Sequence, residues 1–243
     1  MLLLSLTATA LASPCRALLA PTPHSQPDGP RCLAGAVATA MSLTEAETTP
    51  TALAREVKVT PAGIDPFDIQ LAGEALGAQS LVFTGPPEAA ARLVEAGFAP
   101  VALVSRSGNA RHAVTVTGAE RGVDETGQCT TALKALQVYD PLTDRQSWLT
   151  AQAFANLQSA QQLMVFFDEH QRETLDDRGF PVDAAIQVDR RFRARGWLRR
   201  AEAHPKPNAQ SVRLLERAVA ADPDWPVAAS ALSAHRQHLG ESP

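Results

Sequence analysis

The order of two hydrophobic patterns constrains the fold of this chain more than any other feature. Up to residue 76 the sequence predicts helices: a small apolar stretch covers Leu33 to Met41, and helix-start signals occur at Thr49-Pro50 and Asp65-Pro66. From residue 80 to residue 167 most segments are short and strand-like, and His112 to Thr117 alternates strictly. Helices that precede strands, instead of alternating with them, predict an α+β domain with an antiparallel sheet.

The later part of the chain contains further expected elements. The expected strands are 80–83, 100–104, 112–117, 136–140 and 163–167, and the expected helices between them are 86–96 and 149–157. After Phe167 the charge density rises, which predicts a solvated linker. From Asp183 onward the pattern is helical again, with segments at 211–220 and 227–239.

Composition excludes several classes of protein. The chain has 243 residues, of which 45% are apolar and 20% charged, so it can form a real core and is not compositionally disordered. The net charge is -4 and no long basic run occurs, which argues against a nucleic-acid partner. The three cysteines lack zinc-ligand spacing, so we expect no metal and no cofactor. Their odd, small number argues against a disulfide framework.

The N-terminal segment resembles a secretion signal. Leu2 to Ala12 is apolar and of signal-peptide length, and Ala10-Leu11-Ala12 resembles a cleavage site, although a basic region before it is missing. Cys15 follows a proline, which fits a lipid-modified cysteine poorly. We therefore expect export to a periplasmic or extracellular location; the alternative is a disordered tail on a cytoplasmic protein. No other stretch approaches the roughly 20 apolar residues of a membrane span.

Cys32 is the candidate nucleophile. It lies where a loop rich in proline and glycine meets the buried helix, and a helix N-terminus favours the thiolate form of a cysteine. Arg31 adds positive charge beside it. Cys15 and Cys129 lack this setting, and Cys129 lies in a polar stretch that predicts a hairpin loop. The alternative is that Cys32 is a small buried hydrophobic residue, as most free cysteines are.

His112 is the candidate base. It begins a strand and shares a face with Val114 and Val116, which we expect to point into the core. The other five histidines lie in tails, in the expected linker or on polar helix faces. The alternative is a hydrogen-bonded structural histidine at a strand edge.

Two further residues complete a possible catalytic set. Asp140 ends a strand and precedes a proline, an arrangement that is also common in turns. Gln26 lies six positions before Cys32, and its amide could donate to an oxyanion, although an ordinary loop glutamine is the simpler explanation. A thiolate nucleophile needs a base, a group that orients the base and oxyanion donors, and the chain offers one candidate for each.

Taken together, these residues resemble the papain-like cysteine peptidases, and within them the double-glycine leader peptidase family that matures bacteriocins and pheromones. The resemblance rests on Gln26 upstream of a cysteine with a small-residue helix, Cys32 to Met41. It continues with a histidine and β-branched strand, His112 to Gly118, and with Asp140-Pro141 followed by a helix and a final strand that ends at Phe167. It implies a papain-like fold, with N-terminal helices packed on an antiparallel sheet.

The resemblance also implies roles. Cys32 would be the nucleophile, His112 the base, Asp140 its orienting acid, and Gln26 an oxyanion donor together with the backbone N–H of Cys32. Leu33 departs from the family, which usually has glycine after the cysteine, and could narrow the approach to the thiol. The chain also lacks the P-loop of the family's fused transporters. It would then be a free-standing bacterial relative whose substrate is a peptide or protein.

Two alternatives remain open at the level of sequence. A non-catalytic peptide-binding module could use the same fold, and Leu33 is the feature that favours it. An acyl-transferring enzyme could use the same triad with an amine in place of water as acceptor.

The C-terminal helices resemble a tetratricopeptide repeat junction. Residues 214–228 show a helix with small residues at packing positions, an Asp-Pro turn and a new helix start. A plain helical hairpin explains the pattern equally well, and either could bind a protein partner. The expected organisation is a signal peptide or tail at 1–20, a peptidase domain at 21–167, a linker at 168–182 and a helical segment at 183–243.

Overall fold

The computed structural model describes residues 15–26, 29–105, 111–177 and 182–240. Its elements, in chain order, are β1 (Arg16–Leu18), α1 (Cys32–Met41), α2 (Pro50–Glu56), α3 (Pro66–Ala75), β2 (Gln79–Thr84), α4 (Pro87–Glu95), β3 (Val101–Ser105), β4 (Arg111–Val123), β5 (Cys129–Asp140), β6 (Arg145–Thr150), α5 (Ala151–Leu157), β7 (Gln158–Phe167), α6 (Glu169–Asp177), α7 (Val182–Glu202), α8 (Ala209–Ala221) and α9 (Pro226–His238).

The strands form one antiparallel sheet in the order β2-β7-β3-β4-β5-β6, with β1 added beside β4. The long strand β4 is the centre of this arrangement, because β3 pairs with its first residues and β1 with Gly118 to Glu120. The α+β class and the antiparallel sheet predicted from the sequence are therefore confirmed.

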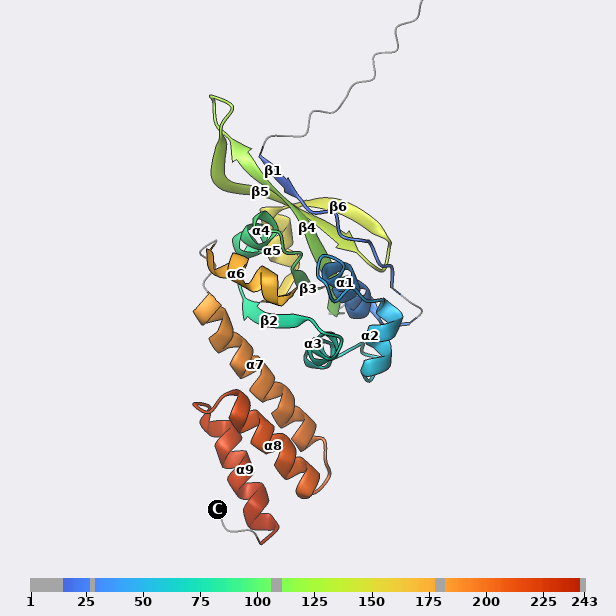
Figure 1. Cartoon of the computed structure of the whole chain (residues 1–243), viewed down its shortest axis with the longest axis vertical. Helices are drawn as coiled ribbons and strands as arrows, with labels where there is room; N and C mark the ends of the chain where they lie inside the picture. The colour runs from blue at the N-terminus through green and yellow to red at the C-terminus, as the bar shows by residue number, and fades with distance from the viewer. Residues whose placement is uncertain (1–14, 27–28, 106–110, 178–181, 241–243) are drawn as a thin grey trace, which may run out of the picture.

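Helices cover both faces of the sheet, as Figure 1 shows. On one face, α1, α2 and α3 pack on strand residues that include Val101, Ala113 and Met164. On the other face, α4 and α5 pack on residues that include Val114 and Leu163. The two sets alternate along β2, β3 and β7, as the period of two in a β-strand requires. The sheet is therefore buried on both faces over its central strands.

The predicted helix starts are formed by side-chain caps. Thr49 accepts a hydrogen bond from the backbone N–H of Ala52, and Asp65 from that of Phe67, with a proline at the first helical position in both cases. Gly77, at φ +102°, ends α3 in the left-handed conformation that glycine adopts most readily.

Three expectations about secondary structure are wrong. Residues 145–150 form β6, so the helix predicted from Leu149 begins only at Ala151, where Thr150 caps it. The predicted linker contains α6, whose Leu175 is 1% exposed and packs in the core. Part of the predicted tail forms β1, a strand of three residues that is too short to give a recognisable period. Residues 1–14 lie outside the described residues, and so does most of the predicted signal segment.

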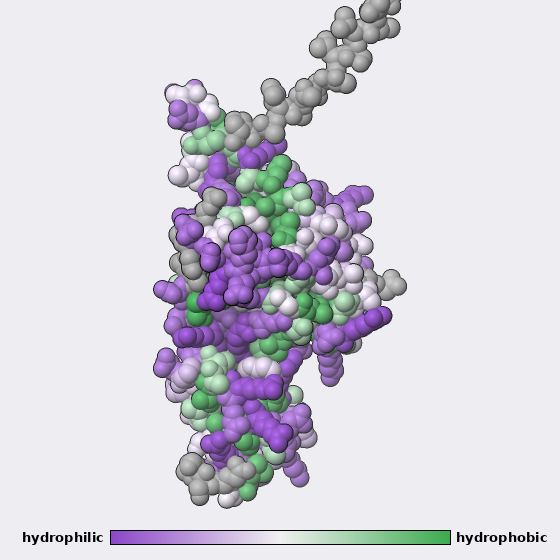
Figure 2. All heavy atoms as spheres, viewed as in Figure 1, coloured by the Kyte–Doolittle hydropathy of each residue, from purple (hydrophilic) through white to green (hydrophobic). Residues whose placement is uncertain are grey.

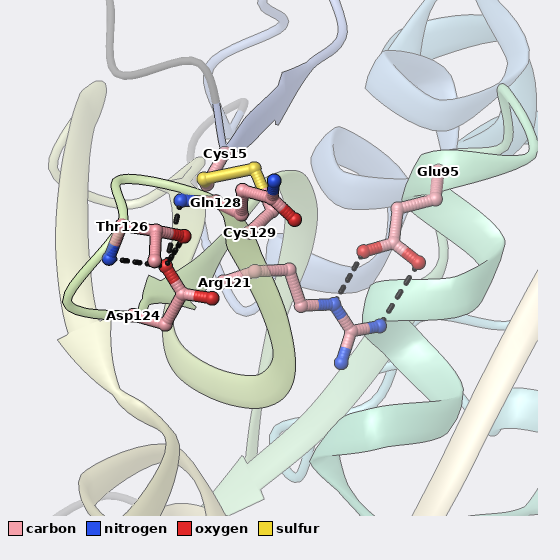
Figure 3. Close-up of a disulfide and its surroundings, with 7 residues drawn as sticks. All are labelled: Cys15, Glu95, Arg121, Asp124, Thr126, Gln128 and Cys129. Carbon is pink, nitrogen blue, oxygen red and sulfur yellow. Dashed lines mark hydrogen bonds and ion pairs between the residues drawn. A yellow bond between two sulfur atoms is a disulfide. The ribbon is translucent and has the colours of Figure 1, made fainter.

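The expectation of no disulfide is also wrong, since Cys15 and Cys129 are bonded with their Cα atoms 5.4 Å apart. Figure 3 shows this disulfide where β1 meets the start of β5, with Asp124 accepting hydrogen bonds in the hairpin turn beside it. Cys129 is thus the first residue of β5 and not a loop residue. The two cysteines are 114 positions apart, and only the pairing of β1 and β5 with β4 brings them together. Cys32 is the odd cysteine and remains free.

Helix α7 is attached to the sheet through a buried carboxylate. Asp189 is 5% exposed and accepts hydrogen bonds from the Gln70 side chain at 2.7 Å and from the backbone N–H of Val82 at 2.8 Å. Val82 lies on β2, which is the edge strand of the sheet, so Asp189 satisfies a donor that no neighbouring strand reaches. Arg193 pairs with both Asp189 and Glu74 and completes the network. Helix α7 therefore covers this edge.

Helix α7 also approaches α3 closely. The ring of Phe67 is 1% exposed and lies edge-on against Phe192 and Trp197 of α7. Gly196 permits this contact, because a Cβ atom there would lie 2.2 Å from the Phe67 ring. The sequence-based boundaries at residues 167 and 183 remain a prediction, but α7 packs directly on the first part of the chain.

Helices α8 and α9 pack at the far end of α7, away from the sheet (Figure 1). A small cluster of Leu198, Ala201 and Leu215 holds α7 and α8 together. Asp222, between α8 and α9, pairs with Arg191 of α7. The tetratricopeptide resemblance of these helices remains a prediction. Figure 2 shows that hydrophilic residues cover most of the viewed face of the molecule. Within the described ranges, no helix has the length and apolar character to cross a membrane.

Candidate active site

Cys32 is the first residue of α1, and its side chain is partly exposed. No described side chain caps this end of α1, and the backbone N–H of Leu33 in its first turn contacts the Cys32 side chain. Thr115 of β4 donates a 2.8 Å hydrogen bond to the carbonyl of Ala36 and fixes α1 on the sheet. The small residues of α1 allow this close packing, since residues 33–41 are all buried. The helix therefore presents Cys32 at the end of a rigid element.

His112 and Asp140 lie next to Cys32. His112 is the second residue of β4, and its Nε2 is 2.7 Å from Oδ1 of Asp140, the last residue of β5. His112 also forms a hydrogen bond with the Cys32 side chain. Because Nε2 faces Asp140, Nδ1 is the ring nitrogen that remains for this bond. The same Asp140 oxygen accepts from the backbone N–H of Leu142 at 2.9 Å, which orients the carboxylate. The structure thus brings the three residues predicted as nucleophile, base and orienting acid together in a hydrogen-bonded chain.

The surroundings of Cys32, His112 and Asp140 shift the pKa values of all three side chains. Burial alone raises the pKa of the Cys32 thiol, but the hydrogen bond and charge of His112, together with the N–H groups of Ala113 and Leu33, bring it below its ordinary value. Burial alone lowers the pKa of His112, but Cys32 and Asp140 raise it above its ordinary value. Burial opposes ionisation of Asp140 as well, yet Leu142 N–H and His112 hold its pKa below the usual range. Both shifts move the pair in the direction of a thiolate and an imidazolium.

Gln26 lies beside this group. Its backbone N–H donates to the carbonyl of Pro141 at 2.6 Å, and its side-chain amide donates to the carbonyl of Gly29. Gly35 of α1 allows this segment to approach, because a Cβ atom there would lie 2.8 Å from Pro141 and 3.4 Å from the Gln26 nitrogen. The structure thus places Gln26 against the Asp140-Pro141 turn, with its side-chain amide bonded to Gly29.

A cavity of about 340 Å³ opens beside Cys32 and His112. Its lining residues are Pro30, Cys32, Leu33, Lys58, Thr60, Ala62, Gly63, Ile64, Asp65, Pro66, Asp68, Leu103, Arg111, His112 and Ala113. Leu33 of α1 is 4% exposed, packs in the core and lines the cavity, while the neighbouring Cys32 is partly exposed. The narrowing expected from Leu33 stays a prediction.

No sequence pattern predicted that these charged residues line the cavity. Lys58 and Arg111 lie next to elements whose ends were predicted, but no spacing rule connects them to Cys32. The only signal for Arg111 is its position directly before His112. In the described part of the chain, no three His, Cys, Asp or Glu side chains gather as a metal site would require.

The structure is similar to double-glycine leader peptidase domains, the class that the sequence resembles. One match is a double glycine motif protease from an AMS/PCAT transporter in complex with the leader peptide, with 14% identity, 62% of this chain and 93% of that chain covered, and a TM-score of 0.47. Another is the peptidase domain of Streptococcus ComA, a bifunctional ABC transporter of a quorum-sensing pathway, with 13% identity, 60% and 97% covered, and a TM-score of 0.48. The peptidase domain of Streptococcus mutans ComA matches with 13% identity, 62% and 98% covered, and a TM-score of 0.40.

No family model and no curated protein matches the chain. At the identities and TM-scores of the three structural matches, nothing about activity follows from them.

Proposed function

We propose that this protein is a cysteine peptidase that cleaves peptide bonds with Cys32, His112 and Asp140. The observation that supports this best is the hydrogen-bonded chain from Cys32 through His112 to Asp140 beside an open cavity. A structural cysteine does not need a buried histidine whose second nitrogen is held by a carboxylate. A nucleophilic thiolate does, because the base must keep its orientation during proton transfer.

The proposed reaction has two halves. The Cys32 thiolate attacks the carbonyl carbon of the peptide bond, and the negative charge that forms on the oxygen is stabilised by the backbone N–H of Cys32 and the side-chain amide of Gln26. The imidazolium of His112 gives its proton to the leaving amine, and a thioester remains on Cys32. His112 then takes a proton from water, the resulting hydroxide attacks the thioester, and the carboxylic acid leaves as the thiolate re-forms.

The lowered pKa of Cys32 predicts its alkylation profile. We expect limiting iodoacetamide to modify native Cys32 at pH values well below the ordinary pKa of a thiol, because the thiolate is the reactive form. In His112→Ala the profile should move to higher pH, since burial then raises the pKa without an opposing charge. Cys32 is the free thiol of the chain, so the rate can be followed by mass spectrometry of the intact protein.

The matched control for this experiment is His235→Ala. His235 is a half-buried histidine of α9 whose Nδ1 lies 3.0 Å from the carbonyl of Ala231, far from the cavity in sequence and outside its lining. Its removal should leave the profile unchanged. If wild-type Cys32 behaved like an ordinary thiol across the whole pH range, the catalytic role would have to be abandoned in favour of the peptide-binding alternative.

We also propose that the protein is exported. Disulfides persist in oxidising compartments, and the Cys15–Cys129 bond links two segments of the chain that each belong to the sheet. A cut after Ala12 would leave Cys15 in the mature protein. The proposal predicts that protein recovered from the native host begins after the apolar segment, as read by N-terminal sequencing. Recovery of the full chain with Met1 and three reduced cysteines would contradict it.

A further inference from the structure

Besides the Cys32–His112 pair, four residues that line the cavity are charged. Asp65 and Asp68 stand at the start of α3, and Lys58 and Arg111 lie on the exposed rim. Taken alone, two carboxylates and two cations would leave this part of the cavity without net charge. The preference of the cavity for one kind of peptide therefore depends on what else reaches these side chains.

Two arginines of helix α7 pair with the two carboxylates of the cavity. Arg200 donates to Asp68 at 2.6 Å, and Arg199 donates to Asp65 at 3.2 Å. Arg200 also lies over the rings of Phe67 and Trp197, at 5.2 and 5.0 Å from their centroids, which fixes its guanidinium in place. Both carboxylates of the cavity are thus matched by arginines that come from more than 130 positions later in the chain.

The two cations of the rim have no such partners. Among the residues that the structure describes, neither Lys58 nor Arg111 forms an ion pair, so their charges face the cavity and solvent. With the two arginines of α7 included, the charged residues around the cavity sum to an excess of two positive charges. The chain as a whole carries -4, so this excess is local. At physiological salt a charge acts over about 8 Å, so a bound peptide responds to this local excess more than to the net charge of the protein.

We propose that the cavity selects acidic peptide segments, with Lys58 and Arg111 as specificity-determining residues. Arg199 and Arg200 of α7 neutralise the cavity's two carboxylates, which would otherwise repel such a segment. This inference deepens the proposed peptidase function and rests on it in taking the cavity as the substrate cleft. The apolar lining residues Leu33, Ile64 and Leu103 would accommodate hydrophobic side chains of the same segment. The C-terminal part of the chain, through α7, thereby takes part in the choice of substrate.

The test is a binding experiment on the full chain carrying Cys32→Ala, so that no turnover occurs. Two fluorescein-labelled degenerate decapeptide pools, identical except for Glu or Gln at alternate positions, are titrated by fluorescence anisotropy. We expect the Glu pool to bind about fivefold more tightly, since each exposed charge contact is worth roughly a factor of two to three. The difference should disappear at about 1 M NaCl, where the Debye length is about 3 Å.

Charge variants assign the effect. Lys58→Gln with Arg111→Gln should make the two pools bind equally, and Lys58→Glu with Arg111→Glu should reverse the preference. Arg199→Gln with Arg200→Gln should weaken the preference by exposing Asp65 and Asp68. The matched control is Arg195→Gln, which removes one charge from an exposed position of α7 outside the cavity lining and should change nothing.

The outcomes separate this inference from the proposed function. Equal binding of the two pools, binding of neither pool, or a preference that survives in the Lys58 and Arg111 variants would overturn the selectivity. If the wild-type protein cleaved both pools at the same rate, the peptidase function would be supported and the selectivity for acidic segments would be contradicted. A clear preference for the Glu pool in a protein whose Cys32 reacts like an ordinary thiol would support the selectivity and contradict the peptidase function.

Discussion

Replacing Cys32 by alanine is expected to lower peptide hydrolysis by at least about 10⁴-fold, because the residues of a nucleophile–base unit cannot act without the nucleophile. The fold should remain intact, since the thiol is partly exposed and alanine is a good helix former at the start of α1. Hydrolysis of the labelled peptide pools measures the activity, and circular dichroism with a melting curve measures the fold. Full turnover by the variant would show that the proposed mechanism is wrong.

A companion variant separates the role of the base from that of the nucleophile. His112→Ala should also remove most activity, but with a changed pH dependence, because the rate should then follow thiolate formation at the higher pKa of an unassisted buried thiol. Cys32→Ala has no thiolate to titrate, and its residual rate should not follow this ionisation. Identical pH profiles for the wild-type protein and His112→Ala would remove His112 from the mechanism.

Removing the Cys15–Cys129 disulfide should lower the free energy of unfolding by about 5 kcal/mol, because closing a loop between cysteines 114 positions apart restricts the unfolded chain by about this amount. The bond also holds β1, which pairs with β4 over only three residues. The double variant Cys15→Ser with Cys129→Ser, compared with the wild-type protein by urea denaturation, measures the change.

Reductant provides an internal control for this prediction. Dithiothreitol should lower the urea midpoint of the wild-type protein toward that of the double variant, and should leave the double variant unchanged. The neighbouring Arg121–Glu95 ion pair, which joins β4 to α4 in Figure 3, remains in both forms and keeps the hairpin attached. A wild-type protein whose stability is indifferent to reductant would show that the two cysteines are not bonded in solution.

Much of the fold was predictable from the sequence because local signals agree with it. The caps at Thr49 and Asp65 place the starts of α2 and α3, and the strict alternation after His112 identifies β4. The strand β6 and the helix α6 were missed for opposite reasons. Residues 145–150 lack a clear apolar alternation, and the charged residues of α6 conceal the buried Leu175.

The candidate site was predictable in its members and not in its surroundings. Cys32, His112 and Asp140 each stand at the end of a regular element, where reactive side chains can be held rigidly, and this can be recognised along the chain. The cavity beside them depends on Lys58 and Arg111, which carry no local signal. The roles of the three residues and of Gln26 remain proposals that the experiments above test.

The sequence by itself determined which segments are helices and strands around the site, since capping, glycine termination and hydrophobic period act over a few residues. Only the tertiary structure decided which distant residues meet. Cys15 reaches Cys129 because β1 and β5 pair with the same strand, although 114 positions separate them. Arg200 reaches Asp68 because Asp189 attaches α7 to the free edge of β2. Contacts of this kind depend on how all the strands pair and how the helices cover the sheet, and no short stretch of sequence contains that information.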